Sequence, residues 1–134
     1  RVSGPLLDRI DIHIEIPAVP FKELSLDQLR EDSATIRYRV SETRKMQMER
    51  YKKEGIYCNS HLKPKLLKKY CGIDPDSKRL IELAMNKLGL SARAYNRILK
   101  VARTIADLAQ RGSILAPDIA EAIQYRSLDR RNFA

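Results

Sequence analysis

The sequence predicts a mainly α-helical protein: a small helical bundle preceded by a long basic helix and one short N-terminal strand. Apolar residues recur at steps of three and four over most of the second half of the chain, which is typical of amphipathic helices. Capping residues and prolines mark the helix starts, and glycines mark their ends. With 134 residues and 43% hydrophobic content, the chain is long enough to bury one core.

The N-terminal strand is predicted at residues 9–17, which read R-I-D-I-H-I-E-I-P. Ile10, Ile12, Ile14 and Ile16 alternate with polar residues, so one face of the strand is apolar. No later run has comparable strand character, and a lone strand leaves its backbone groups unpaired. We therefore expect its partners to lie in sequence outside this chain, or in another chain. The start at Arg1 without a methionine fits an excised fragment, or a processed N-terminus equally well.

A long helix is predicted at about residues 34–53, after a proline-containing connector and a short helix around 25–30. Asp32 or Ser33 supplies its N-cap, and Gly55 ends it. Its apolar stripe is narrow and consists mainly of Ile36, Val40 and Tyr51. Basic residues outnumber acidic ones along it, so we expect most of this helix to face solvent or a partner.

The bundle is predicted to begin near Tyr57. Pro64 is placed to open a short helix at 64–71, since the first helical position needs no backbone N–H. Asp74 caps the next helix, which ends at Gly89 and buries Leu80, Ile81, Ala84 and Leu88. A last helix begins near Pro117 and turns Ile119, Ala122 and Ile123 inward. Residues 126–134 form a basic tail.

The central helix of the bundle is predicted between Gly89 and Gly112, with Ser91 as its N-cap. Its apolar stripe consists of Ile98, Val101, Ala102, Ile105, Leu108 and Ala109. Its opposite face carries Arg93, Arg97, Lys100 and Arg103, with no carboxylate between Gly89 and Ala106 to neutralise them. Arg93 and Arg97 occupy the first two turns, where the helix dipole disfavours cations. This arrangement indicates that an anion binds there.

Charge and composition narrow the class of partner. The formal net charge of +9 favours an acidic partner such as nucleic acid or nucleotide phosphate. No apolar run is long enough to span a membrane, and no signal-peptide pattern opens the chain, so we expect no membrane partner. Two cysteines are too few for a disulfide scaffold and fit the reducing cytoplasm, where we expect the protein to act.

The chain lacks the motifs of a self-contained catalytic site. It has no glycine-rich phosphate loop, no G-K-[ST] triplet, and no pair of carboxylates beside a nucleophile. Cys58 and His61, followed by Cys71, superficially resemble zinc ligands. Three candidates without a fourth favour ordinary buried thiols instead, so we predict no metal site.

Two arginines are the candidate phosphate-binding residues. Guanidinium is planar, permanently charged and able to donate two parallel hydrogen bonds, which suits a phosphoryl group that develops charge. Arg9 immediately precedes the predicted strand, and Arg93 lies in the first turn of the central helix. The alternative for each is a solvated residue or a salt bridge, for example between Arg9 and Asp8 or Asp11.

Several segments resemble one protein family. Residues 6–11 (L-L-D-R-I-D) resemble the arginine-finger segment in the magnesium-chelatase and minichromosome-maintenance branch of AAA+ ATPases. Residues 91–108 are similar to the sensor-2 helix of that branch, with Arg93 at the S-x-R position. With G-I-Y-C-N at 55–59 and A-I-Q-Y-R-S-L-D-R at 122–130, the chain resembles the C-terminal region of bacterial magnesium-chelatase-like AAA+ ATPases of the ComM/YifB family.

The resemblance implies three parts. Residues 1–32 would end the α/β ATPase core, residues 33–56 would be an inserted long helix, and residues 57–134 would form the helical lid. Arg9 would act as an arginine finger in the neighbouring subunit of a hexameric ring, and Arg93 would be the sensor-2 contact, with Arg97 as the fallback. Because the Walker A and B segments are missing, we expect no ATP hydrolysis by this chain alone. ATP and Mg²⁺ would bind to the full-length protein, and no cofactor is expected in the isolated chain.

Three functions remain open. The resemblance favours a DNA-remodelling motor with helicase or branch-migration activity in natural transformation, whose partners are its own core, neighbouring subunits and DNA. A chelatase-like motor that remodels a protein partner is the second. The third is a basic helical module that binds nucleic acid through Arg37, Arg44, Lys45, Lys52, Lys65, Lys68 and Lys69. Tyr51, Tyr57 and Tyr70 could stack on bases, although such tyrosines more often cover a core.

Overall fold

The structure is a computed structural model, and it describes residues 3–24 and 30–126. Within these ranges the chain is helical and contains no strand, so the predicted mainly α bundle is confirmed. The helices are α1 (Gly4–Leu7), α2 (Phe21–Leu24), α3 (Ser33–Arg50), α4 (Pro64–Tyr70), α5 (Pro75–Leu88), α6 (Ala92–Leu108) and α7 (Ala116–Gln124), with 3₁₀ turns η1 (Lys52–Glu54) and η2 (Asn59–His61).

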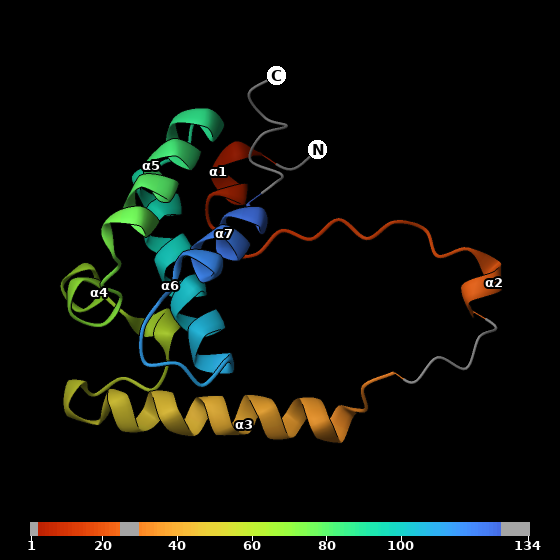
Figure 1. Cartoon of the computed structure of the whole chain (residues 1–134), viewed down its shortest axis with the longest axis horizontal. Helices are drawn as coiled ribbons and strands as arrows, with labels where there is room; N and C mark the ends of the chain where they lie inside the picture. The colour runs from red at the N-terminus through yellow and green to blue at the C-terminus, as the bar shows by residue number, and fades with distance from the viewer. Residues whose placement is uncertain (1–2, 25–29, 127–134) are drawn as a thin grey trace.

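The bundle is built around α6, which contacts α3, α4, α7 and η2, while α5 packs on α7. One apolar core joins these elements: Tyr51, Leu62, Leu67, Cys71, Ile81, Ile98, Leu99, Ala102, Ala106, Ile114, Ile119 and Ala122. Figure 1 shows α3 lying along one end of the bundle, while the segment before α2 runs away from it. Among the described residues, no helix is long and apolar enough to cross a membrane.

The predicted helix starts are confirmed by their hydrogen bonds. The side chain of Asp32 accepts from the Thr35 amide at 2.7 Å, that of Asp74 from the Ser77 amide at 2.6 Å, and that of Ser91 from the Ala94 amide at 3.2 Å. Hydrogen bonds from the side chain and the amide of Thr35 lower the pKa of Asp32, and the bond from the Ser77 amide lowers the pKa of Asp74. Gly89 ends α5 in a left-handed conformation with φ of 62°, which a residue with a side chain rarely adopts.

The predicted strand at 9–17 is wrong for this chain. Residues 10–20 form neither helix nor strand, because none of the described residues offers a partner strand. The four isoleucines of the alternating pattern are exposed, and His13 is buried instead. The backbone N–H of His13 donates to the Tyr125 carbonyl at 2.7 Å, and its Nε2 lies 3.2 Å from the Leu7 carbonyl. The segment therefore docks on the bundle through polar contacts at the end of α7.

Two other predicted segments cannot be compared with the structure. Most of the short helix expected around 25–30 lies outside the described residues, and so does the basic tail after Arg126.

The predicted end and faces of α6 also need correction. The helix ends at Leu108, before Gly112, and Gln110 takes the positive φ of 56° after it. Arg103, placed on the solvent face by the sequence, is buried. Its guanidinium donates to the carbonyls of Arg111 at 2.8 Å and Gly112 at 2.9 Å, which closes the turn after the helix. Leu108 and Ala109, expected in the core, are exposed.

A buried carboxylate, Asp107, joins three elements. It accepts hydrogen bonds from Gln47 at 3.1 Å and from Arg50 at 2.5 and 2.9 Å, both on α3. It also accepts from Asn59 of η2 at 2.9 Å and from Arg103 of α6 at 3.1 Å. The hydrogen bonds to Asp107 raise the pKa of Arg50 above its ordinary value. The Asp107 network is therefore a satisfied buried polar cluster, with both acidic oxygens fully used.

A second buried carboxylate, Asp118, fixes the start of α7. It accepts from the Leu115 amide at 2.8 Å and from Arg111 at 2.7 Å. Burial would raise the pKa of Asp118, but Arg111 and the Leu115 amide outweigh it and hold the pKa below its ordinary value. The ion pair links α7 to the turn that follows α6.

We predict that Asp107→Ala lowers the free energy of unfolding by about 3–5 kcal/mol, because it leaves the buried guanidinium of Arg103 without its carboxylate. Urea unfolding followed by circular dichroism measures the loss. The matched control is Asp76→Ala on α5, whose ion pair with Arg79 is exposed and whose loss costs at most about 1 kcal/mol. Equal losses in the two variants would contradict the role of the network.

We predict that Asp118→Asn lowers the free energy of unfolding by about 2 kcal/mol at neutral pH, since a charge-assisted pair is lost. The folded-state pKa of Asp118 is depressed. Its carboxylate therefore stabilises the fold above the unfolded pKa of about 4, and this contribution is lost as the pH falls through the folded pKa. Urea titrations at several pH values should show the two proteins converging in acid. A difference that does not change with pH would contradict this assignment.

Candidate functional site

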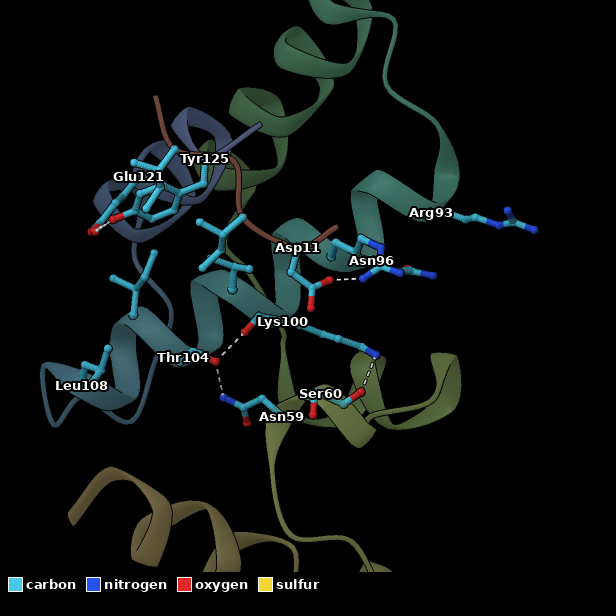
Figure 2. Close-up of a pocket in the computed structure, with 15 residues that line it drawn as sticks. Asp11, Asn59, Ser60, Arg93, Asn96, Lys100, Thr104, Leu108, Glu121 and Tyr125 are labelled. Atoms are coloured by element: carbon cyan, nitrogen blue, oxygen red, sulfur yellow. Dashed lines mark hydrogen bonds and ion pairs between the residues drawn. The ribbon is translucent and has the colours of Figure 1, made fainter. Parts of the chain in front are cut away.

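A cavity of about 600 Å³ runs along α6, and we call it the α6 groove. Its walls come from α6, from the segment around Asp11 to Ile14, from η2 and from the end of α7. Figure 2 shows these side chains gathered around α6. The N-terminal half of α6 contributes Arg93, Asn96, Arg97 and Lys100, while its C-terminal half contributes Val101, Thr104, Ile105 and Leu108. One half is therefore cationic, and the other is mainly apolar.

The apolar half of the groove explains why the predicted stripe of α6 is only partly buried. Val101 and Ile105 are half-buried because they pack against the core and also line the groove, whereas Leu108 lines the groove and is exposed. Ile12 and Ile14 of the N-terminal segment lie in the same wall. The sequence pattern could not separate a core-facing residue from a groove-facing one, since both are apolar at helical spacing.

The cations of the groove differ in their partners. Arg97 forms an ion pair with Asp11, and Lys100 donates to the Ser60 carbonyl at 2.9 Å. Arg93 is exposed and makes no hydrogen bond or ion pair with the residues that the structure describes. In Figure 2 its guanidinium points away from the other labelled side chains. The groove thus holds three cations against one carboxylate at this end, with the positive end of the α6 dipole beside them.

Arg9, the candidate arginine finger, does not line the α6 groove. It follows α1 directly and its side chain is exposed, with no ion pair to the described residues. Its backbone is held in place, because its N–H donates to the Leu6 carbonyl at 3.0 Å. Asp8 and Asp11, considered as its partners, pair with Arg126 and Arg97 instead.

The turn that carries Arg9 is anchored by Arg126. The buried guanidinium of Arg126 donates to the carbonyl of Ile10 and to that of Leu7 at 3.4 Å. Leu7 is itself buried. The end of α7 therefore clamps the chain on both sides of Arg9, while the side chain of Arg9 remains in solvent.

The seven basic residues considered for nucleic acid are all exposed. They lie on two regions: Arg37, Arg44, Lys45 and Lys52 on α3 and η1, and Lys65, Lys68 and Lys69 on α4. Lys45 pairs with Glu42 at 2.7 Å, and Lys69 pairs with Glu54 at 2.5 Å. Exposed pairs of this kind are weak, so they leave the lysines able to exchange partners.

The three tyrosines considered for base stacking separate into two groups. Tyr51 is buried and Tyr70 is half-buried, and their rings meet edge to face with centroids 5.0 Å apart. Tyr51 and Tyr70 therefore belong to the core, which is the more common role of such tyrosines and the alternative to base stacking. Tyr57 is 66% exposed and is the one of the three whose ring faces solvent.

Both cysteines are buried free thiols. Burial raises the pKa of Cys71 to about 11. Burial also opposes ionisation of Cys58, but hydrogen bonds from Ser60 and Arg44 outweigh it and lower the pKa of that thiol. Within the described residues no three histidine, cysteine or acidic side chains are grouped as metal ligands would be.

The sequence reasoning missed the buried polar residues that position the site. Asp107, Gln47 and Asn59 fix α3 and η2 against α6, and Arg126 fixes the turn of Arg9. One signal was present: Arg103 and Asp107 are four residues apart and directly follow Ala102 and Ala106, two residues of the core. Asn59 and Arg126 also lie in the two short motifs that carried the family resemblance.

Comparison with known proteins agrees with that resemblance. The family model of the magnesium chelatase subunit ChlI C-terminal domain matches residues 30–126. The chain is 46% identical over 131 residues to competence protein ComM of Haemophilus influenzae, and 42% identical to YifB of Salmonella typhimurium, an uncharacterised protein. It is 30% identical over 133 residues to the uncharacterised Rv2897c of Mycobacterium tuberculosis.

These matches cover 97–98% of this chain but only 25–26% of each relative, so the chain spans about a quarter of their length. The match with the family model includes α3, the whole bundle and Arg93, whereas Arg9 lies before it. This chain therefore belongs to the family of the magnesium chelatase ChlI C-terminal domain, and within it to the ComM/YifB group.

Proposed function

We propose that this chain is the helical lid of a hexameric AAA+ ATPase that remodels DNA in the cytoplasm, and that Arg93 binds the phosphates of ATP. The observation that carries the proposal is the position of Arg93. It is an exposed cation without an ion-pair partner among the described residues, in the first turn of α6 and at the cationic end of the α6 groove. A phosphate bound there would compensate the charge of Arg93 and offset its repulsion by the positive end of the helix dipole.

The backbone beneath Arg93 is fixed, which suits a residue that must report on a bound phosphate. Ser91 caps the helix, and Ala94, the residue after Arg93, is buried together with Ile98 one turn later. The guanidinium is therefore carried by a rigid turn while its tip is free. Preorganisation of this kind lowers the entropic cost of binding.

Arg97 is the weaker candidate for the same contact. Its charge is already compensated by Asp11, so a phosphate must displace that carboxylate before Arg97 can bind it. Arg93 needs no such exchange. This difference supports Arg93 as sensor 2 and leaves Arg97 as a second contact.

Arg9 has the properties of an arginine finger that acts in a neighbouring subunit. Its side chain is exposed, lies outside the α6 groove and is carried by a turn that Arg126 anchors. An arginine so placed is free to reach a nucleotide on another molecule. The core would then hold ATP and Mg²⁺, and Arg9 and Arg93 from adjacent subunits of the ring would complete the nucleotide-binding site.

DNA is the proposed substrate of the motor. The net charge of +9 and the exposed basic residues of α3 and α4 favour a polyanion. The relative from Haemophilus influenzae is named a competence protein, which agrees with a role in natural transformation by helicase or branch-migration activity.

We predict that Arg9→Ala and Arg93→Ala each reduce ATP turnover, the first by about 10³-fold, as expected when an arginine finger is lost. The assay uses a chimera in which this chain replaces the matching quarter of the Haemophilus influenzae relative. The matched control is Arg79→Ala, an exposed arginine of α5 outside the groove. Wild-type turnover in both variants would refute the assignment, provided that the chimera assembles normally.

We predict that DNA binding by this chain weakens steeply as salt rises from about 50 to about 200 mM, because each neutralised phosphate releases counterions. Replacing both Arg37 and Arg44 by alanine should reduce the slope of log K against log salt by about two. Fluorescence anisotropy with a labelled oligonucleotide measures both effects. Affinity that ignores salt, or no binding in dilute buffer, would remove DNA from the function of this chain.

A further inference from the structure

We propose that a second cavity, at the C-terminal end of α3, binds an unstacked base of single-stranded nucleic acid, with Tyr57 as the stacking surface and Lys45 and Lys52 as phosphate contacts. This inference rests on the DNA role proposed above, and it specifies the form of nucleic acid and the place where it binds. We call the site the Tyr57 cavity.

The Tyr57 cavity has a volume of about 430 Å³, within the usual range for small-ligand sites. One wall is a single side of α3 and η1, because its residues are three and four positions apart: Lys45, Met48, Glu49 and Lys52. The other wall is the loop from Gly55 to Tyr57. The cavity therefore has an apolar surface between two lysines.

The fold fixes Tyr57 in this loop with its ring in solvent. Gly55 adopts a left-handed conformation with φ of 67°, which lets the chain reverse after η1. Ile56 then packs against the core, and Cys58 is buried. Tyr57 lies between two inward-facing neighbours and is 66% exposed. An exposed aromatic ring on an anchored backbone is prepared for stacking at little entropic cost.

The charges around the ring match a nucleotide strand. Lys45 and Lys52 are both exposed, and the exposed pair of Lys45 with Glu42 is weak enough to be exchanged for a phosphate. Glu49 also lines the cavity, and its negative charge would repel a nearby phosphate. It faces the same cavity as the ring, where it can accept a hydrogen bond from an N–H of a base, such as the amino group of cytosine or the ring N3–H of thymine.

Single strands fit this arrangement better than duplex. In a duplex the flat faces of the bases are covered by their neighbours, so no face is available to an exposed tyrosine. In a single strand each base has a free face between two phosphates, and stacking on an aromatic side chain contributes binding energy independently of sequence. The proposed occupant is therefore an unpaired nucleotide and its flanking phosphates.

The test compares the binding of a labelled oligothymidylate and of an abasic strand with the same number of phosphates, using the whole chain and fluorescence anisotropy. We expect Tyr57→Ala to weaken binding of the oligothymidylate by roughly 5- to 100-fold, the range for loss of one stacked base. Tyr57→Phe keeps the ring and should bind within about twofold of the wild type. Wild type should bind the abasic strand about as weakly as Tyr57→Ala does.

Tyr38→Ala is the matched control, because Tyr38 is a 70% exposed tyrosine of α3 outside the Tyr57 cavity. It should bind like the wild type, whereas Lys52→Ala should reduce the salt slope by about one. If the wild type binds the strand but Tyr57→Ala and Tyr38→Ala are equal, the Tyr57 cavity is refuted and the DNA role stands. If the wild type binds no strand in dilute buffer, both proposals fail.

Discussion

The carboxylate of Asp107 is the point at which three separate elements of the chain meet. It lies near the end of α6 and is surrounded by donors from α3, η2 and α6 itself. Two of the donors, Arg50 and Arg103, are cationic, and Asp107 is the carboxylate that both of them pair with. A buried cluster of this kind specifies one arrangement of its elements, because any other arrangement leaves a charge or an amide unpaired.

The position of α3 follows from this constraint. Within the helix only Thr43 and Gln47 are buried, and the apolar residues of its N-terminal half are exposed. The helix is therefore attached at its C-terminal end, by Gln47 and Arg50 to Asp107 and by the ring of Tyr51 in the core. The rest of α3 extends along one end of the bundle (Figure 1). Its basic side chains in this part are exposed. Polar contacts, more than apolar burial, hold the basic surface in place.

The sequence predicted the helices and their starts because these depend on local chemistry. Asp32, Asp74 and Ser91 cap helices through bonds to residues three positions away, which a linear pattern can reveal. The strand prediction failed because alternation describes only one partner of a sheet, and the described chain supplies no second. His13 shows the same limit: it contacts the backbone carbonyls of Tyr125 and Leu7, and a pattern of side chains cannot reveal such partners.

Only part of the α6 groove could be predicted from the sequence, because some of its contacts join residues far apart in the chain. The cationic face of α6 was visible in the sequence, and so was the lack of local carboxylates, but the pairing of Arg97 with Asp11 joins residues that are far apart in the chain. The same holds for Arg103, whose partners include the carbonyls of the turn after the helix. A helical pattern assigns the polar residues to the solvent-facing side of the helix. A buried arginine that pairs with a buried aspartate breaks this rule, and the pattern gives no sign of it.

The clamp formed by Arg126 also affects the order in which the chain matures. It joins the carbonyls of Leu7 and Ile10 to a residue more than a hundred positions later. During synthesis the turn that carries Arg9 leaves the ribosome more than a hundred residues before Arg126, so the clamp cannot form until α7 has been made and folded. The bundle must therefore be assembled before this arginine acquires a fixed place, so an incomplete chain exposes the arginine without positioning it.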